Sequence, residues 1–313
     1  MKGKDLLSIS DIGSQDIRLL ISHAADIKAA GWLSSLSGKT LALLFEKPSL
    51  RTRVSFEVAM RQLGGQVIYL SPAEVGLGER ESVPDVARVL GRYVNAIATR
   101  TFSHQTLEIM AGNSSVPVIN ALSDLEHPCQ ALADIFTIYE KKGELDGLTL
   151  AFVGDGNNVA HSLLLAASLV GMNFRIASPG GYQVHDGVLH LAQGYAADSG
   201  AGILCTEEPQ MAVSGADVVY TDVWTSMGQE AEAQERRRIF ANYQVNSELL
   251  SLAREDAIFM HPLPAHHGEE VAEGILDSPK SVIFDQAENR MHMQKALLMH
   301  ILGGLEIPLA GYR

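Results

Sequence analysis

Two hydroxyl side chains and two guanidiniums stand together in the segment Ser49-Leu50-Arg51-Thr52-Arg53, directly after a short apolar run. Arginine offers paired N–H donors that match phosphate oxygens, and serine and threonine hydroxyls add short hydrogen bonds. A helix that begins here would also present free backbone N–H groups and the positive end of its dipole. The segment lacks the Gly-x4-Gly-Lys-Ser/Thr spacing of a P-loop. It predicts an anion site of another kind, the alternative being a capped helix with solvated arginines.

Two further arginines lie far away along the chain. Arg100 follows a predicted strand, and Arg290 begins the last predicted helix. A lone arginine at either place is typical of a protein surface. If the guanidiniums converge, they can hold one multiply charged anion, so we predict that Arg51, Arg100 and Arg290 share a site.

The segment His127-Pro128-Cys129-Gln130 opens a predicted helix that ends at Lys142. Proline suits the first turn of a helix, which places His127 at the cap position. His127 and Gln130 lie one turn apart, so both can donate to a carbonyl oxygen on which negative charge develops. The alternative is a neutral cap histidine beside a solvated glutamine. Cys129 has no evident base beside it and is predicted to be a small buried apolar residue.

Polar segments also follow two predicted strands of the second half. The segment Gly154-Asp155-Gly156-Asn157-Asn158 lacks the third glycine of a dinucleotide fingerprint, and no ribose-binding acid ends the next strand. Its asparagines can bind a polar ligand instead. Asp222 is placed to meet an ammonium group, the alternative being an aspartate that caps a turn. The loop Ser226-Met227-Gly228 after it is predicted to be mobile.

Three histidines and two glutamates gather in the segment His261-Pro262-Leu263-Pro264-Ala265-His266-His267-Gly268-Glu269-Glu270. It has no zinc-binding spacing such as His-x-x-Glu-His, and its prolines stiffen the loop, so we expect no metal. A turn that presents backbone carbonyls to a ligand fits better. The chain has no Gly-x-Ser-x-Gly elbow, no paired catalytic carboxylates and no Cys-x-x-Cys motif. The residues therefore suit direct transfer between two bound substrates, through positioning and electrostatics.

Short β-rich runs alternate with longer helix-like stretches, which predicts parallel sheets covered on both faces. Ligands bind such sheets at the carboxyl ends of strands, where the polar segments lie. The predicted strands are 40–45, 66–70, 95–98, 116–120, 149–153, 174–177, 217–220, 257–260 and 281–284. The predicted helices are 17–30, 53–63, 83–93, 128–142, 159–170 and 290–302.

Length and one polar stretch divide the chain in two. A chain of 313 residues suggests about two domains, and the polar stretch 141–147, with two glycines, is the best linker candidate. The expected fold class is α/β, with two doubly wound domains that have parallel central sheets and are linked by interdomain helices. We place the first domain at 1–143 and the second at 144–287, with a last helix at 288–313 that packs back across the junction.

Composition narrows the partners and the compartment. The chain has 37 acidic and 24 basic residues, and a net charge of −13 argues against nucleic acid or an anionic membrane as a partner. Its 2 cysteines cannot form a disulfide framework. We see neither the apolar core of a signal peptide nor a run long enough to span a bilayer. We therefore expect a soluble, cytoplasmic protein.

Taken in order, these motifs resemble those of the aspartate/ornithine carbamoyltransferase family, over essentially the whole chain. Segment 49–53 is similar to the family's Ser-Thr-Arg-Thr-Arg motif, with Leu50 in place of the first threonine. Segment 127–130 is identical to the version found in the ornithine enzymes, and segment 222–228 is similar to their Ser-Met-Gly loop. Gly156-Asn157-Asn158 and Glu288-Asn289-Arg290 match as well.

The resemblance implies that carbamoyl phosphate and L-ornithine react to give L-citrulline and phosphate, with no cofactor and no metal, as in arginine biosynthesis or degradation. It implies domains that close on the ligands, in a homotrimer or an assembly of trimers with shared active sites. The implied catalytic residues are Arg51, His127, Gln130 and Arg290. The residues implied to bind carbamoyl phosphate are Ser49, Leu50, Arg51, Thr52, Gly76, Arg100, His127, Pro128, Cys129, Gln130, Pro262, Leu263 and Arg290. Those implied to bind ornithine are Asn158, Asp222, Ser226 and Met227.

Two positions depart from the family pattern. The ornithine enzymes usually read His-Cys-Leu-Pro where this chain has His261-Pro262-Leu263-Pro264, so proline replaces the thiol that normally lies beside the acceptor amine. The family's interface-crossing glutamine corresponds to Gly76, of which only the backbone can approach the donor. We predict a working enzyme whose contacts to the ornithine side chain differ from the usual set.

Three alternatives stay open at this point. The first is a carbamoyltransferase with another acceptor, such as aspartate, an acylated ornithine or a diamine. The second is an NAD(P)-dependent dehydrogenase built on Gly154-Asp155-Gly156. The third is a non-catalytic sensor of a small molecule.

Overall fold

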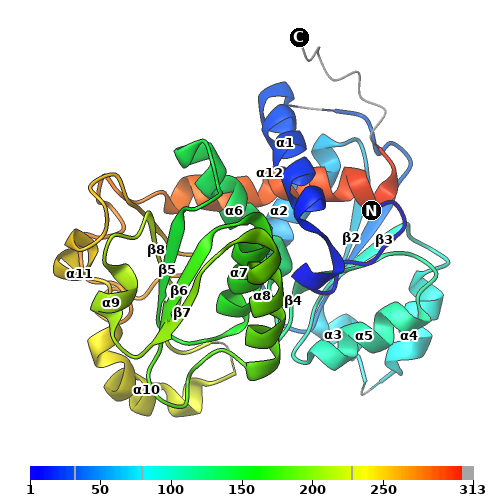
Figure 1. The fold of residues 1–313 in the computed structure, drawn as a ribbon. Coiled ribbons are helices and arrows are strands. Elements are labelled where there is room, and N and C mark those ends of the chain that lie inside the picture. The colour runs from blue at the N-terminus through cyan, green and yellow to red at the C-terminus, as the bar shows by residue number, and fades with distance from the viewer. Residues whose placement is uncertain (32, 79, 227, 305–313) are drawn as a thin grey trace, which may run out of the picture. The chain divides into compact units, whose positions relative to one another are not determined.

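The computed structural model describes residues 1–31, 33–78, 80–226 and 228–304, and these form two compact units (Figure 1). The first unit comprises residues 1–136 and the segment from Asn289 onward, and the second comprises residues 137–288. Helices α6 (Pro128–Lys142) and α12 (Ile283–Leu302) contribute residues to both units. Each unit contains one parallel sheet, which confirms the predicted α/β class. The predicted domain limits, at 143/144 and at 287/288, stay a prediction.

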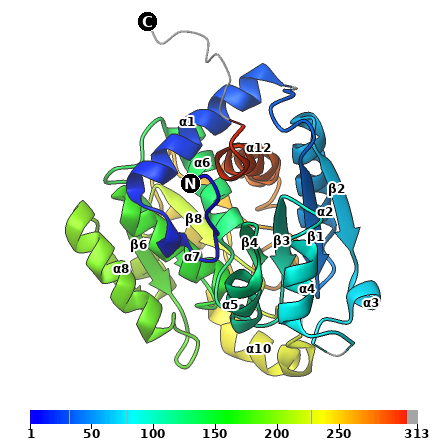
Figure 2. The same cartoon turned by 90° about the vertical axis from the view of Figure 1, so that its right-hand side faces the viewer.

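The sheet of the first unit has the strand order β2-β1-β3-β4, with every pair parallel (Figure 2). All residues of β3 are buried, as a strand covered on both faces requires. The strands are β1 (Thr40–Phe45), β2 (Gln66–Leu70), β3 (Ala96–Arg100) and β4 (Val118–Leu122). The helices that lie wholly in this unit are α1 (Ser14–Ala30), α2 (Leu50–Gln62), α3 (Pro72–Val75), α4 (Val83–Leu90) and α5 (His104–Asn113), with a 3-10 turn, η1 (Ile9–Asp11).

The sheet of the second unit has the order β7-β6-β5-β8-β9, again entirely parallel. Its strands are β5 (Thr149–Val153), β6 (Asn173–Ala177), β7 (Ile203–Thr206), β8 (Val218–Thr221) and β9 (Ile258–Met260). Its helices are α7 (Asn158–Val170), α8 (Asp186–Ser199), α9 (Pro209–Val213), α10 (Ala233–Ile239) and α11 (Ser247–Ser251), with 3-10 turns η2 (Glu230–Glu232) and η3 (Phe240–Tyr243).

In each sheet the order of the strands reverses at one position, which is called the switch point. The two strands that meet there are each followed by a polar segment. In the first unit β1 lies beside β3, and the last residues of the two strands, Phe45 and Arg100, are register partners. In the second unit β5 lies beside β8, and Val153 pairs with Thr221. Open α/β sheets bind their ligands at such switch points. The order of the strands therefore brings segments that are distant in the sequence to one edge.

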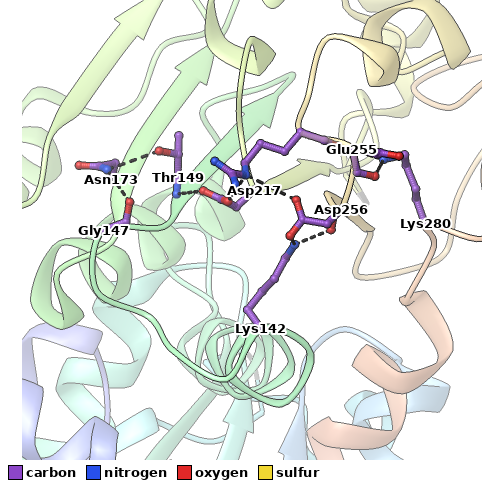
Figure 3. Close-up of polar contacts among 9 residues, drawn as sticks. Lys142, Gly147, Thr149, Asn173, Asp217, Glu255, Asp256 and Lys280 are labelled. Atoms are coloured by element: carbon purple, nitrogen blue, oxygen red, sulfur yellow. Dashed lines mark hydrogen bonds and ion pairs between the residues drawn. The ribbon is translucent and has the colours of Figure 1, made fainter.

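The amino ends of the second sheet are closed by polar contacts (Figure 3). The Thr149 N–H donates to Asp217 at 2.8 Å, which ties the start of β5 to the residue before β8. The Asn173 amide donates to the Gly147 carbonyl oxygen at 3.0 Å. Lys142, at the end of α6, binds the Asp256 carboxylate at 2.9 Å. These contacts fix the edge opposite the switch point, which leaves the carboxyl edge for a ligand.

One predicted strand is wrong. Residues 281–284 do not form a strand, because α12 already begins at Ile283, and only Ser281 makes an isolated bridge to Phe259. Burial then recurs at Val282, Gln286 and Asn289, the period of a helix, while Phe284 faces solvent. Arg290 consequently lies in the third turn of α12 and not at its start.

Other elements were missed or begin earlier than predicted. Helices α5 and α8 and strand β7 were not predicted; α8 contains two glycines, and β7 is an edge strand with a mixed burial pattern. Helix α2 begins at Leu50, before the predicted Arg53, so Arg51 lies inside its first turn. Arg100 is the last residue of β3 and does not follow it. In the described ranges, no helix combines the length and the apolar character needed to cross a bilayer.

Candidate active site

The start of α2 is organised by Ser49, its N-cap. Ser49 has extended backbone angles, and its hydroxyl accepts from the Thr52 N–H at 3.3 Å and donates to the Thr52 hydroxyl at 3.0 Å. The N–H groups of Leu50 and Arg51 have no acceptor within a helix that begins here. The side chain of Leu50 faces solvent, so only its backbone can serve the site. The predicted capped helix with a free N-terminal turn is confirmed.

The structure brings the three predicted arginines together. Arg290 donates to the Thr52 hydroxyl at 2.7 Å, which places the third turn of α12 at the first turn of α2. Burial, together with the neighbouring charges of Arg290 and Arg51, lowers the pKa of Arg100 to about 10. Like charges act on one another in this way only at short range.

No carboxylate in the described part of the chain neutralises the charges of Arg51 and Arg100, two members of the arginine group formed with Arg290. Neither forms an ion pair with a carboxylate in the described part of the chain, and Nε of Arg100 is buried there without a hydrogen-bond partner. Arg100 is only 7% exposed. Burying a charge without a partner carries a free-energy cost on the order of several kcal/mol. A bound anion would remove this cost, and the geometry is that of an anion site.

His127 caps α6 as predicted and lies beside the arginines. Its carbonyl oxygen accepts from the N–H groups of Gln130 and Ala131, both at 3.1 Å. Burial, followed by the charges of Arg290 and Arg100, holds the pKa of His127 well below its ordinary value. The imidazole is therefore neutral at physiological pH and can donate from one ring nitrogen.

The Gln130 amide is oriented by Asp134 and offers an acceptor that the sequence did not predict. Its amide nitrogen donates to Asp134 at 2.8 Å, and its amide oxygen is buried without a partner in the described structure. The carboxylate of Asp134 can only accept, which fixes the orientation of the amide. Gln130 thus presents an acceptor oxygen to a ligand, while its amide nitrogen has a second N–H, so its predicted role as a donor stays a prediction.

Cys129 and Gly76 contribute little reactive chemistry of their own. The Cys129 thiol donates to the Asn120 carbonyl oxygen at 3.4 Å, and burial raises its pKa to about 12, so it is inert as predicted. Gly76 ends α3 with φ 55°, and its N–H and carbonyl groups bind Pro72 and Arg80 within that turn. A side chain at Gly76 would approach Arg80 to 3.0 Å in a strained backbone conformation.

In the second unit, Asp222 and Asn157 meet at the switch point. Asn157 caps α7 by accepting from Val159 and Ala160, and its amide nitrogen donates to Asp222 at 2.8 Å. Burial raises the pKa of Asp222, and the Glu270 carboxylate adds to the rise, against the lowering effects of the nearby His261 and of the hydrogen bonds from Asn157 and Val223. Asn158 begins α7 directly beside this pair. The Asn157 cap occupies the N–H groups that a dinucleotide phosphate would need.

An ion pair that the sequence did not reveal fixes this edge. Arg236 of α10 binds Asp155 at 2.6 Å and donates to the Trp224 carbonyl oxygen at 2.8 Å. It therefore joins the loop after β5 to the loop after β8. Ser226 is half-buried, and its N–H donates to Gln229 at 3.0 Å. Met227, the other predicted residue of this loop, lies outside the described residues.

The loop after β9 is held by two buried side chains. His261 accepts from the Leu263 N–H at 2.9 Å through Nδ1 and lies 3.2 Å from Glu270 through Nε2. Leu263 has φ 58°, which costs a non-glycine residue about 1–2 kcal/mol. The Leu263-Pro264 peptide bond is cis, and Pro262 is buried. This is the predicted proline turn, and His261 and Glu270 hold it in place.

Side chains of a metal-binding type also occur in this loop. Single ligand atoms of His266, Glu269 and Glu270 lie within 4.8 Å of one another. However, Glu269 already pairs with Arg237 at 2.8 Å, and Glu270 accepts from the His266 N–H at 2.6 Å. The protein's own contacts explain the cluster, and we assign no metal to it.

Comparison with known proteins identifies the family. A sequence model described as "Aspartate/ornithine carbamoyltransferase, carbamoyl-P binding domain" matches residues 4–140, and one described as "Aspartate/ornithine carbamoyltransferase, Asp/Orn binding domain" matches residues 146–301. The chain belongs to the aspartate/ornithine carbamoyltransferase family. The arginine group lies in the part matched by the carbamoyl-P binding model, apart from Arg290, and Asp222 lies in the part matched by the Asp/Orn binding model.

Members of the family resemble the chain along almost its whole length. An ornithine carbamoyltransferase of Anoxybacillus flavithermus is 53% identical over 306 residues, covering 96% of this chain and 98% of its own. A protein of Pyrococcus furiosus named "Ornithine carbamoyltransferase, anabolic" is 50% identical, covering 98% of each chain. The solved ornithine carbamoyltransferase structure from Pyrococcus furiosus superposes with a TM-score of 0.94 at 50% identity, covering 97% of this chain and 99% of its own. The family resemblance inferred from the motifs is confirmed.

Proposed function

We propose that this protein transfers the carbamoyl group of carbamoyl phosphate to the side-chain amine of L-ornithine, giving L-citrulline and phosphate. The observation that carries the proposal is the group formed by Arg51, Arg100 and Arg290, in which mutual repulsion helps to lower the pKa of Arg100. The choice of ornithine is supported by the names of relatives about half identical over nearly the full chain.

The first unit holds the donor. The guanidiniums of Arg51 and Arg100, the hydroxyls of Ser49 and Thr52, and the free N–H groups at the start of α2 bind the phosphate. All of these groups can donate once the Ser49 hydroxyl, which otherwise donates to Thr52, turns to the ligand, so together they match a dianion with many acceptor oxygens. The exposed Leu50 side chain takes no part, and only its N–H does.

The carbamoyl group lies between donors and an acceptor. His127 and Arg290 donate to its oxygen, where negative charge grows during the reaction. The amide oxygen of Gln130 accepts from its NH2 group, because the Gln130 nitrogen is held by Asp134. This arrangement distinguishes the two ends of a planar carbamoyl group.

The second unit holds the acceptor. Asp222 accepts from an ornithine ammonium or amine group, and the polar groups of Asn158 and Ser226 bind the amino-acid end, with Met227 in the same role. Backbone carbonyls of Pro262 and Leu263 take the place of the missing thiol as acceptors, and they also contact the carbamoyl group of the donor, as the resemblance implies. In the first unit, Pro128 and Cys129 serve the donor, carbamoyl phosphate, through their backbone at the start of α6.

The chemistry needs no protein nucleophile. The neutral amine of ornithine attacks the carbamoyl carbon, and a C–N bond forms as the carbonyl oxygen becomes an oxyanion. Collapse of this intermediate breaks the bond to the phosphate oxygen, and the departing phosphate accepts the proton released by the amine. The protein contributes positioning and charge stabilisation, of which a single oxyanion donor is typically worth about 10²–10³ in rate.

We further propose a homotrimer, or an assembly of trimers, in the cytoplasm. The support is the family membership and the half-buried turn at Gly76, whose counterpart in the family pattern reaches a neighbouring subunit. Analytical ultracentrifugation tests the assembly, with an expected mass of three times 33.8 kDa or a multiple of that value. A monomer at micromolar concentration would contradict it.

Initial-rate assays test the activity. With carbamoyl phosphate present, L-ornithine is expected to yield citrulline and phosphate in equal amounts, while L-aspartate yields at least about 100-fold less product, since the site carries acids for an ammonium group. Turnover with aspartate alone would refute the acceptor, and absence of phosphate release with any amine would refute the transferase.

A further inference from the structure

Glu270 is a buried carboxylate at the end of the loop that follows β9. It is fully buried, and its Oε1 accepts from the His266 N–H at 2.6 Å and lies 3.2 Å from Nε2 of His261. Its other oxygen, Oε2, is buried without a hydrogen-bond partner in the part of the chain described here, and it lies 3.7 Å from Nδ1 of His266. Such a group is expensive to bury, so its place calls for a function.

The His261 ring has one proton, and the geometry says where it is. A backbone N–H can only donate, so Nδ1 of His261, which receives the Leu263 N–H at 2.9 Å, carries no proton. The proton is then on Nε2 and points to the Glu270 carboxylate. The carboxylate selects the tautomer that lets Nδ1 hold Leu263.

The segment that His261 holds, Pro262-Leu263, contains the proline that departs from the family pattern. Leu263 adopts φ 58°, a conformation that a leucine leaves unless its surroundings hold it. The backbone N–H of His261 donates to the Gln286 side chain at 2.9 Å, which holds the start of this loop in place. The direction of the Pro262 and Leu263 carbonyls thus depends on the chain from Glu270 through His261 to Leu263.

We propose that Glu270 is a positioning residue for the acceptor: through the tautomer of His261 it fixes the Pro262-Leu263 carbonyls that replace the missing thiol. This inference rests on the proposed function. Glu270 also lies near enough to Asp222 to act on its charge. The acceptor half of the site therefore has two acids, of which only Asp222 binds the amine directly.

Steady-state kinetics of Glu270→Gln test the proposal, with Glu269→Gln as the matched control. Glu269 is the adjacent residue, and it is only half-buried and paired with Arg237. For Glu270→Gln we expect the KM for ornithine to rise by about 10- to 100-fold, the loss typical of slightly misplaced binding groups. The KM for carbamoyl phosphate should change less than about fivefold, because the arginine group that binds its phosphate is untouched and only the Pro262 and Leu263 carbonyls move. Glu269→Gln should resemble the unmodified protein in both constants.

Two variants of His261 separate positioning from simple loss of structure. His261→Asn retains an acceptor near the place of Nδ1 but cannot reach Glu270, whereas His261→Gln reaches Glu270 but loses Leu263. Both should raise the KM for ornithine, and adding Glu270→Gln to His261→Asn should cause no further rise, because the two residues act as one chain. Additive effects of the two substitutions would overturn the proposal.

Nitrogen NMR of the histidine-labelled full chain gives a readout that does not depend on activity. The unmodified protein should show His261 with a protonated Nε2 and a bare Nδ1, and Glu270→Gln should show a mixture of tautomers or the other one. If citrulline forms but Glu270→Gln leaves both the tautomer and the KM for ornithine unchanged, the role of Glu270 is wrong while the proposed function stands. If the unmodified protein forms no citrulline, the proposed function fails, and the tautomer still reports on the Glu270–His261 link.

Discussion

In the first unit, the burial of arginine side chains close to one another lowers the stability of the protein when no ligand is bound. Arg100 is almost fully buried beside Arg51 and Arg290, and its Nε lacks a partner among the described residues. This repulsion disfavours the empty state and disappears when a dianion binds. Ligand binding should therefore stabilise the protein, by about 2.7 kcal/mol at a concentration 100 times Kd.

The substitution Arg51→Ala tests whether this side chain binds the phosphate of carbamoyl phosphate. Arg51 forms no ion pair in the described structure, so its removal leaves no stranded acid and should not destabilise the empty protein. The KM for carbamoyl phosphate should rise by about 10- to 1,000-fold, the loss of one or two charge-assisted hydrogen bonds. Arg53→Ala is the control, because Arg53 is exposed and binds Glu57. Equal kinetics in the two variants would contradict the phosphate site.

The side chains that we propose to bind the ligands could be picked out in the sequence, but the residues that hold those side chains in place could not. Ser49 and Arg51 are close neighbours, and a helix start explains their joint role without any long-range information. Arg236 meets Asp155 across 81 positions, and no local pattern announces such a pair. The orientation of the Gln130 amide likewise depends on Asp134, whose side-chain direction a sequence does not specify.

Whole elements matter here through the switch points that they form. The pairing of β1 with β3 brings Phe45 and Arg100 together, and the pairing of β5 with β8 does the same for Val153 and Thr221. The alternation of strands and helices predicted the parallel sheets. Because the connections between parallel strands are nearly always right-handed, only a few strand orders are possible in such a sheet. The alternation did not predict the start of α12, because a short apolar run fits a strand or a buried helix equally well.

Gly156→Ala tests how closely the loop after β5 is packed. An added Cβ would lie 2.3 Å from the Val184 nitrogen, which real atoms do not tolerate. We expect a loss of about 1–3 kcal/mol in the free energy of unfolding, as for other overpacked sites. Thermal denaturation measures it. Gly187→Ala in α8, where nothing lies within 4 Å, should be neutral or slightly stabilising. Similar melting of both variants would show that the loop can yield.

The contact between α1 and α12 makes stability depend on pH. Nδ1 of His23 lies 2.7 Å from Nε2 of His300, and burial, with the charges of His23 and the N-terminus, lowers the pKa of His300 to about 4, against the opposing effect of Asp16. The unfolded chain binds this proton near pH about 6.5. The contribution of His300 is therefore complete above that value and is lost as the pH falls toward 4.

Melting curves at pH 7 and pH 5 measure this effect. The melting temperature should fall on acidification, and it should fall less in His300→Gln, which cannot bind the proton in either state. His190→Gln is the control, since His190 is exposed on α8. If His300→Gln loses as much as the unmodified protein does, the His23–His300 contact is not the cause.

The whole molecule combines an acidic surface with one cationic site. Its net charge is −13, yet Arg51, Arg100 and Arg290 converge from positions spread over most of the sequence. Net charge thus predicted the absence of a polyanionic partner class but said nothing of this site, which depends on the fold. The family motifs indicated the reaction, and the order of the strands explains why residues that are far apart in the sequence can take part in it.

A bisubstrate analogue tests the central claim in one binding measurement. We would titrate the protein with a compound that joins a phosphonate analogue of the donor to the side-chain nitrogen of L-ornithine, and with the corresponding L-aspartate compound. The proposed chemistry predicts that the ornithine compound binds at least about 100-fold more tightly than carbamoyl phosphate alone, as such analogues do. Arg51→Ala and Asp222→Ala should each weaken it. Equal or tighter binding of the aspartate compound, or binding insensitive to both substitutions, would contradict the assignment.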